Sequence, residues 1–177
     1  MLFFKDLTHF PVQDRLKMLA ADHKAPDFEL PDQNGEKVKL SDFKRQWVVL
    51  YFYHKDMTPG CTTEACNFQE ALHDFQNLKA VVLGVSKDSV ERHKKFAEKY
   101  NLRFRLLSDA ENNVCETYGV WGEKSMYGRK YMGINRSTFL IDPQGKIAKV
   151  YPKVKVKKHH QEVKEDLKTL QAAAQSE

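Results

Sequence analysis

Cys61 and Cys66 are the residues of this chain whose type and spacing are best suited to chemistry. They lie in the segment DMTPGCTTEAC, residues 56–66. Thr58 is a good N-cap residue and Pro59 is favoured at the first helical position, so the pattern predicts a helix that begins at Pro59. Cys61 then occupies the third helical position, where unpaired amides and the helix dipole favour a thiolate over a thiol. The segment therefore predicts a nucleophilic cysteine at a helix N-terminus.

A thiolate in this position is suited to attack on a peroxide. Cleavage of an O–O bond by a thiolate leaves a sulfenic acid, which condenses readily with a neighbouring thiol. Cys66 is the nearest candidate for that thiol. Composition and spacing alone leave open a second interpretation, in which Cys61 is a half-buried structural thiol. Cys115, the third cysteine, is expected to be structural.

The elements that must position Cys61 can be predicted from the apolar pattern. The run WVVLYFY, residues 47–53, is apolar throughout and rich in β-branched and aromatic residues, which predicts a strand covered on both faces. Residues 80–85 predict a second buried strand. Chemistry in sheets of this kind is found at the carboxyl ends of strands, and Cys61 lies just beyond the end of the first.

Alternating strands and helices predict an α/β domain with helices packed on a central sheet. Further helices are expected at 59–78, 89–100, 113–118 and 160–174, and further strands at 104–107, 138–142 and 146–151. Turns are expected at 33–36 and 142–145. Residues 1–23 are expected to form an N-terminal extension with a short helix around Leu16–Ala20. The domain proper then spans residues 24–177.

Composition limits the classes of function. With 177 residues, 41% of them hydrophobic, the chain suits one globular domain with a substantial core. The net charge of +5 raises the possibility of a nucleic-acid partner, but no nucleic-acid-binding motif accompanies it. Basic residues are scattered except in KVKVKKHH, residues 153–160. We expect that run to be a solvated strand end and helix start, with an anionic partner surface as the alternative.

The expected cellular location and the expected lack of a cofactor both follow from signals that are missing in the sequence. Apolar runs are strand-length, far below the roughly 20 residues that span a bilayer, and the start does not resemble a secretory signal. Three cysteines are too few for a secreted disulfide framework, so we expect a cytoplasmic protein with no membrane partner. Paired CxxC or HxxxH spacing is missing, and we expect neither a metal nor a cofactor.

Several segments together resemble the peroxiredoxins, in particular the Q-type or bacterioferritin comigratory group. The active-site segment YFYHKDMTPGCTTEACNF carries the resemblance, as do APDFELPD, VVLGVSKDS, YGVWGEK and GINRSTFLID in the family's order. The likeness runs from about residue 25 to 170. It implies a thioredoxin-like fold, with a central mixed β-sheet flanked by helices. It also implies an antioxidant thiol peroxidase that reduces hydrogen peroxide and organic hydroperoxides, with thioredoxin or a similar dithiol as reductant.

The resemblance assigns roles residue by residue. Cys61 matches the peroxidatic cysteine, and Cys66 matches the resolving cysteine that forms an intramolecular disulfide with it. Thr58 matches a threonine that contacts the peroxide, and Arg136 matches the arginine that faces the peroxidatic cysteine. Glu64 matches an acidic residue that orients this arginine.

Some features stay open at this point. His54 stands where the family has proline, and a histidine there could add positive charge at mildly acidic pH. A redox-regulated chaperone or binding module is the alternative function. We expect a monomer or a weak homodimer.

We predict that Cys61→Ser abolishes the initial reaction with peroxide, because Cys61 alone combines the helix position with the Thr58 and Arg136 matches. Stopped-flow measurement of peroxide reduction tests this. Cys115→Ser is the control and should retain the reaction. A wild-type rate in Cys61→Ser would contradict the assignment.

Overall fold

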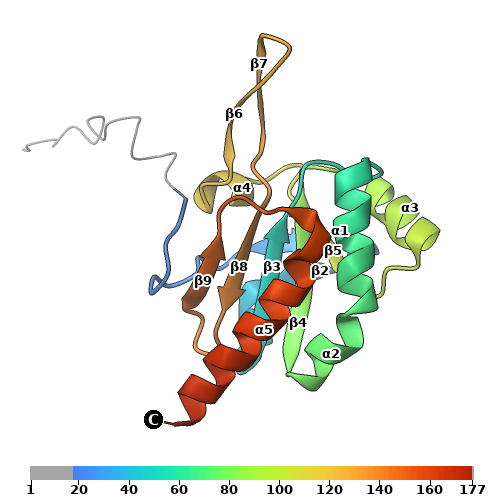
Figure 1. Ribbon diagram of the computed structural model, residues 1–177. Helices are drawn as coiled ribbons and strands as arrows, with labels where there is room; N and C mark the ends of the chain where they lie inside the picture. The colour runs from blue at the N-terminus through green and yellow to red at the C-terminus, as the bar shows by residue number, and fades with distance from the viewer. Residues whose placement is uncertain (1–17, 177) are drawn as a thin grey trace, which may run out of the picture.

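The computed structural model describes residues 18–176 and is built on a five-stranded mixed sheet (Figure 1). The strand order is β5-β4-β3-β8-β9, with β3 parallel to β4, β4 parallel to β5, and β8 antiparallel to both β3 and β9. The strand bounds are β3 Trp47–Phe52, β4 Ala80–Ser86, β5 Arg105–Ser108, β8 Ser137–Ile141 and β9 Ile147–Tyr151. The predicted α/β class and central mixed sheet are confirmed.

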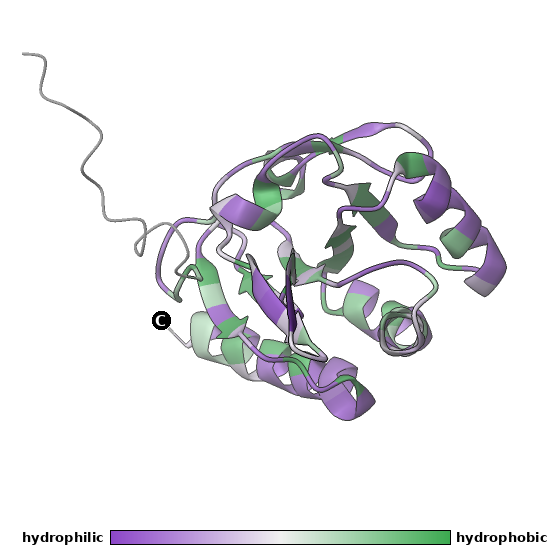
Figure 2. Cartoon of the chain, turned by 90° about the horizontal axis from the view of Figure 1, so that it is seen from above, coloured by the Kyte–Doolittle hydropathy of each residue, from purple (hydrophilic) through white to green (hydrophobic). Residues whose placement is uncertain are grey.

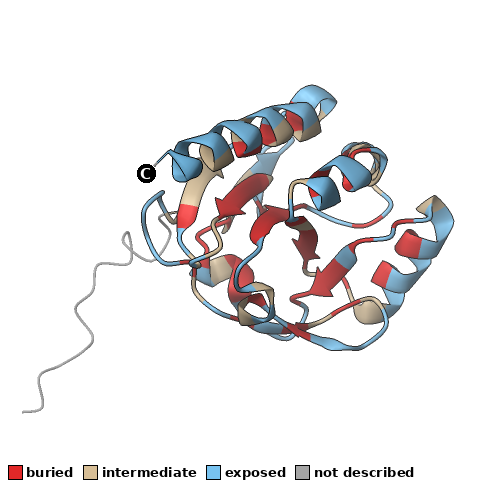
Figure 3. Ribbon diagram, turned by 90° about the horizontal axis from the view of Figure 1, so that it is seen from below, coloured by how far each residue is buried: buried red, intermediate tan, exposed pale blue. Residues whose placement is uncertain are grey.

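The central strand β3 is buried along its whole length, as its sequence predicts. Successive side chains of a strand point to opposite faces, so Val49 and Tyr51 enter one core while Leu50 and Phe52 enter the other. Figure 3 shows the result: the sheet is buried, and the helices are buried only on the side that faces it.

Helices cover one face of the sheet. The core on that face takes side chains from α1 Pro59–Glu70, α2 Leu72–Asn77, α3 Val90–Tyr100 and α5 Val156–Gln175. The other face is covered by the hairpin of β1 Glu29–Pro31 and β2 Lys37–Lys39, the 3-10 helix η2 Leu40–Phe43, and the short helix α4 Val114–Thr117. Each face thus buries its own apolar cluster.

Tight turns join three pairs of strands. The predicted turns at 33–36 and 142–145 are confirmed, with Gly35 and Gly145 each at positive φ. A third hairpin was not predicted: β6 Trp121–Met126 and β7 Arg129–Ile134 pair antiparallel around Tyr127 and Gly128. Both turn residues have positive φ, at 51° and 76°, which is the conformation of a two-residue hairpin loop.

Two helix predictions need correction. The expected helix at 59–78 is divided at Ala71, whose ψ of 0° turns the chain so that Leu72 and Phe75 reach the core. The last helix begins at Val156, four residues before the expected start at 160, since Lys155 supplies the extended N-cap conformation. The helix expected around Leu16–Ala20 lies largely outside the described residues, and residues 18–20 are not helical.

The helices of residues 18–176 include none with the length and apolar character needed to cross a membrane.

We predict that Gly84→Ala in β4 destabilises the protein by about 1–3 kcal/mol, the usual cost of overpacking a core. A Cβ at this position would lie 2.8 Å from Tyr51 Cζ and 3.0 Å from Leu106 Cδ2. Tyr51 has no room to withdraw, because it is fully buried and stacks on Phe68 at 4.8 Å.

Urea denaturation measures the free energy of unfolding. The matched control is Gly122→Ala, whose Cβ would meet only Asn135 Nδ2 at an ordinary 3.5 Å. Equal stability of the two variants would show that β3 and β4 are not packed as tightly as described.

Candidate active site

The antiparallel pairing of β3 and β8 brings two distant parts of the chain together. Phe52, the last residue of β3, is paired with Ser137, the first residue of β8. The loop after β3 leads into α1, and Arg136 immediately precedes β8. The start of α1 and Arg136 therefore meet at the same edge of the sheet, although 75 positions separate Cys61 from Arg136.

Cys61, Arg136 and Glu64 form the centre of the site. Arg136 donates from Nη2 to Cys61 Sγ at 3.2 Å and from Nη1 to Glu64 Oε1 at 2.8 Å. Cys61 and Glu64 are each only 1% exposed. One planar guanidinium thus binds both groups, with its two nitrogens held in a fixed fork.

Burial is the dominant influence on the pKa of Glu64. It raises the pKa of this carboxyl to about 7, although the adjacent Arg136 charge acts in the opposite direction. Glu64 Oε2 is buried without a hydrogen-bond partner among the described residues. For Arg136, burial lowers the pKa, but Glu64 and Cys61 outweigh burial and raise it, so the guanidinium stays charged.

Gly60 makes room for this arrangement. A Cβ at this position would lie 3.1 Å from Arg136 Nη2, closer than most side chains tolerate. The glycine before Cys61 therefore allows the guanidinium to approach the thiol across the first turn of α1.

Thr58 is the N-cap residue of α1 and Pro59 its first residue, so Cys61 does occupy the third helical position. The predicted side-chain cap is absent, however. The Thr58 hydroxyl donates to the Lys55 carbonyl at 2.8 Å and makes no bond to the helix amides. Thr58 also lines the open groove beside the site.

A buried polar network supports the loop between β3 and α1. Tyr53 Oη donates to Asp56 Oδ1 at 2.6 Å, and Asp56 Oδ2 lies 2.6 Å from His93 Nδ1. His93 Nε2 must carry a proton, because it lies 3.1 Å from the Leu107 carbonyl, which can only accept. A further proton is then shared between Asp56 and His93. This buried pair ties the loop before Cys61 to α3.

Asp56, Asp88 and His93 lie close enough together to be tested as a metal site. Each of their ligand atoms already has a protein partner. Asp88 accepts from the Asp56 amide at 2.9 Å, from Ser86 Oγ at 2.6 Å and from Arg92 Nε at 2.9 Å. With all donors and acceptors satisfied internally, the cluster is a structural network.

His54 requires a correction. Its pKa is lowered to about 4, first by burial and then by Lys124 and Arg136. The imidazole is neutral at mildly acidic pH, so it does not supply the positive charge that its position suggested. Lys124 Nζ lies 2.9 Å from His54 Nδ1, which therefore accepts the hydrogen bond. This contact joins the β6–β7 hairpin to the loop before α1.

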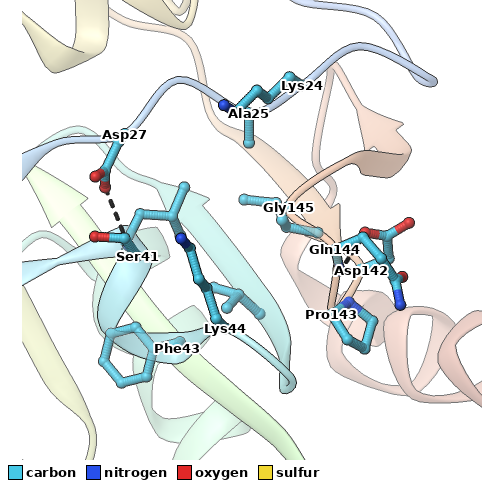
Figure 4. A pocket seen from close by; sticks show the side chains of 13 residues that line it. Lys24, Ala25, Asp27, Ser41, Phe43, Lys44, Asp142, Pro143, Gln144 and Gly145 are labelled. Carbon is cyan, nitrogen blue, oxygen red and sulfur yellow. Dashed lines mark hydrogen bonds between the residues drawn. The ribbon is translucent and has the colours of Figure 1, made fainter.

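Two hollows differ in what they offer chemically. A wide groove of about 1240 Å³ opens beside the site, with Thr58, Gly60 and Arg136 on its wall and the β6–β7 hairpin opposite. A smaller hollow of about 140 Å³ lies near the beginning of β3 and the 142–145 turn (Figure 4). Because Cys61 follows the other end of β3, the smaller hollow does not serve the thiol.

The other two cysteines lie in different surroundings. Cys66 is on α1 with Cys61, is partly exposed, and burial raises the pKa of its thiol. All three cysteines are free thiols. Cys115 is fully buried in the core of the opposite face, and burial together with Asp109 raises its thiol pKa strongly. These surroundings agree with a structural Cys115.

The site and sheet together define a class of protein. A buried cysteine in the first turn of a helix, bound by an arginine at the edge of a five-stranded mixed sheet, is the arrangement expected of a thiol-based redox centre on a thioredoxin-like fold.

Comparison with known proteins identifies the family. The family model described as AhpC/TSA family matches residues 21–150. Peroxiredoxin Bcp of Bacillus subtilis (strain 168) is 55% identical over 147 residues, 83% of this chain and 94% of that protein. Peroxiredoxin Bcp of Escherichia coli (strain K12) is 50% identical over 142 residues, 80% of this chain and 91% of that protein. The chain belongs to the AhpC/TSA family and is a peroxiredoxin of the Bcp group, an oxidoreductase with peroxidase activity.

Solved structures agree. The Xanthomonas campestris bacterioferritin comigratory protein, studied for alkyl peroxide reduction, superposes with a TM-score of 0.79 at 40% identity, covering 84% of this chain and 98% of that one. A mutant of Xylella fastidiosa PrxQ gives a TM-score of 0.79 at 41% identity, covering 89% and 98%.

Sequence reasoning missed the polar network and the His54–Lys124 contact. Asp56 and His93 are 37 positions apart, and a lone histidine in a charged helix carries no signal of its own. The pattern of α3 does contain a clue, because His93 occupies the same helix face as Phe96 and Ala97. A histidine on an apolar face calls for a buried partner.

We predict that Arg136→Met lowers the rate of peroxide reduction roughly 100-fold, by analogy with loss of an oxyanion donor. The variant keeps an unbranched side chain but removes the only cation bound to Cys61 Sγ among the described residues. Stopped-flow rates compare it with Arg103→Met, an exposed arginine elsewhere, which should change little. A rate within about threefold of wild type, well short of that loss, would show that Arg136 does not act on the thiolate.

The raised pKa of Glu64 predicts that the stability of the protein depends on pH. The folded pKa of about 7 lies above the ordinary value of 4.5 for a glutamate, so the folded state holds the proton more tightly. The resulting stabilisation is complete below the lower value and is lost as the pH rises through the higher one. Between about pH 5 and pH 8, the free energy of unfolding of wild type should fall by about 2–3 kcal/mol more than that of Glu64→Gln.

Urea unfolding of the two reduced proteins at both pH values measures this difference. Parallel pH profiles for wild type and Glu64→Gln would contradict a raised pKa at Glu64.

Proposed function

We propose that this peroxidase reduces hydroperoxides at Cys61, closes a Cys61–Cys66 disulfide, and is restored by thioredoxin or a similar dithiol in the cytoplasm. The observation that carries the proposal is the 3.2 Å contact between Arg136 Nη2 and Cys61 Sγ. A fixed guanidinium beside a thiol in the first turn of a helix favours the thiolate, which is the reacting form.

In the first step the thiolate attacks one oxygen of the O–O bond. That oxygen becomes part of a Cys61 sulfenic acid, while the other leaves with the bonding electron pair and takes a proton to form an alcohol or water. Negative charge moves from sulfur to the leaving oxygen, and Arg136 can donate to both. The wide groove beside Thr58 and Arg136 gives the peroxide its way in.

Thr58 and Glu64 have supporting roles in this proposal. The Thr58 hydroxyl, now held by the Lys55 carbonyl, can turn its lone pairs toward a peroxide in the groove. Glu64 is a positioning residue: through its 2.8 Å bond it fixes the orientation of Arg136 without touching the reacting atoms.

In the second step the sulfenic acid condenses with the Cys66 thiol, forming the disulfide and releasing water. Both cysteines lie on α1, five positions apart. In a regular helix such residues have Cα atoms about 8.7 Å apart and side chains turned by roughly 140°. A disulfide needs Cα atoms within about 7 Å, so the first turns of α1 must unwind before the bond forms.

Gly60 favours this unwinding, because glycine costs about 1 kcal/mol relative to alanine within a helix. Unwinding also exposes Cys66, whose burial in the intact helix disfavours its thiolate. In the third step a dithiol reduces the disulfide and becomes oxidised itself. The opened segment gives that reductant access to both sulfurs.

We predict that Cys66→Ser completes one peroxide reduction and then stops at a Cys61 sulfenic acid. Small thiols should recover it, whereas thioredoxin should recover it poorly. Peroxide consumption with a thioredoxin system tests turnover, with Cys115→Ser as a control that should turn over normally. Undiminished turnover of Cys66→Ser would exclude the Cys61–Cys66 disulfide, and a wild-type protein without turnover would favour a redox-regulated binding module.

Amide hydrogen exchange provides a second readout. After peroxide treatment, exchange over residues 59–67 should rise in wild type and change much less in Cys66→Ser. A Cys61–Cys66 bond within a regular α1 would contradict the geometric argument.

A further inference from the structure

Exposed apolar side chains gather at one end of the molecule. Among residues 18–176, the large hydrophobic side chains left exposed are Met57, Met126, Tyr127, Tyr131 and Met132. Four of the five lie on the β6–β7 hairpin, and the fifth is in the loop just before α1. Met126, Tyr127, Tyr131 and Met132 also line the wide groove beside the site, whereas Met57 does not. A concentration of this kind marks an interaction surface.

The hairpin is shaped to reach away from the domain. Its strands form a two-stranded sheet separate from the central one, and each has six residues, which corresponds to about 20 Å. Figure 1 shows it projecting from the end of the molecule where α1 begins. Tyr127 is at the tip and is 99% exposed, with Met126 beside it at 57%. The tip therefore presents an aromatic and a thioether side chain to whatever lies beyond.

Positive charge surrounds these apolar groups. The hairpin carries Lys124, Arg129 and Lys130 against a single acidic residue, Glu123, which pairs with Lys130 at 3.4 Å. Lys87, at the base of the hairpin, adds no net positive charge to this surface, because Asp109 and Glu116 neutralise it.

A second row of lysines lies at the same end. The exposed residues Lys153, Lys155, Lys157 and Lys158 make no ion pair within the described part of the chain. Their segment is fixed beside the site, because the Val154 amide donates to the Arg136 carbonyl and Lys153 shares a hollow with Arg136. Figure 2 looks down on this end of the molecule.

We propose that this end of the molecule docks on an anionic phospholipid bilayer, with the hairpin tip in the headgroup region and the lysines near its surface. Tyrosine is favoured at membrane interfaces, and each basic residue near an anionic surface adds about fivefold to binding. The net charge of +5 attracts the whole chain to such a surface. The protein would lie on the membrane without crossing it.

The shape of the tip favours a bilayer over a protein partner. A protein reductant has to reach the sulfurs on α1, whereas the β6–β7 hairpin extends beyond the rest of the domain (Figure 1). A narrow apolar tip flanked by cations instead matches a lipid bilayer, which is apolar inside and anionic at its surface. The proposal replaces the expectation of no membrane partner. For residues 153–160 it favours contact with an anionic partner surface over a merely solvated strand end and helix start.

Vesicle flotation of the reduced full-length protein tests the proposal. The probes are phosphatidylcholine vesicles with and without phosphatidylglycerol, at low and high salt. Two variants remove separate parts of the surface: Met126→Ser with Tyr127→Ser removes the apolar tip, and Arg129→Gln with Lys130→Gln removes two charges. Lys44→Gln with Arg45→Gln is the matched control, because it removes two exposed charges just before β3, at the opposite end of that strand from Cys61. Thermal melting verifies that each variant is folded.

Wild type should float with the anionic vesicles and not with pure phosphatidylcholine, and salt should release it. The hairpin charge variant should bind up to about 25-fold more weakly, because each of its two basic residues contributes about fivefold. The tip variant should also bind more weakly than wild type, and the control should stay within about twofold of it. Three results would overturn the proposal: no flotation of wild type, wild-type flotation of the tip variant, or equal losses in the control and the hairpin charge variant. None of these readouts depends on peroxidase activity, so the two proposals are tested separately.

Discussion

The site depends on one guanidinium, that of Arg136, whose side chain is only 12% exposed. Arg136 is held between the Cys61 thiol and the Glu64 carboxyl, with both contacts made in a pocket that excludes most solvent. Interactions of charged groups are stronger in such surroundings than in water, and an unpaired charge is correspondingly costly. The sheet pairing that joins β3 to β8, the glycine at position 60 and the polar network below the loop all serve to keep these three groups in contact.

In the proposed mechanism the same helix has to meet two opposing demands. Its intact first turn supports the Cys61 thiolate, yet its regular geometry keeps Cys66 from reaching the sulfenic acid. Reaction and resolution therefore require different conformations of α1. The Asp56–His93 pair bears on this balance, because it anchors the loop that enters the helix and lies outside the helix itself. Burial of Cys66 in the folded helix adds to the separation, since it disfavours the nucleophilic form of the second thiol until unwinding occurs.

Local patterns accounted for much of the fold and for the catalytic helix. The WVVLYFY run and the Thr58-Pro59 start are strong signals because they depend on neighbours in the sequence. Identification of Arg136 required the family resemblance, since an arginine before a strand is unremarkable by itself. What sequence reasoning missed depends on tertiary contact: the break at Ala71, the β6–β7 hairpin, and the low pKa of His54, which follows from partial desolvation and from the nearby Lys124 and Arg136 charges. Such features are decided by packing between segments far apart in the chain.

The proposed mechanism requires Cys61 to be the thiol that reacts with peroxide. The most direct measurement is to expose the reduced wild-type protein to less than one equivalent of hydrogen peroxide in the presence of excess dimedone. Dimedone traps sulfenic acids, and tandem mass spectrometry of the digest locates the adduct. We predict dimedone on Cys61, with Cys66 and Cys115 unlabelled. Label on Cys66 or Cys115 with Cys61 unmodified would contradict the account.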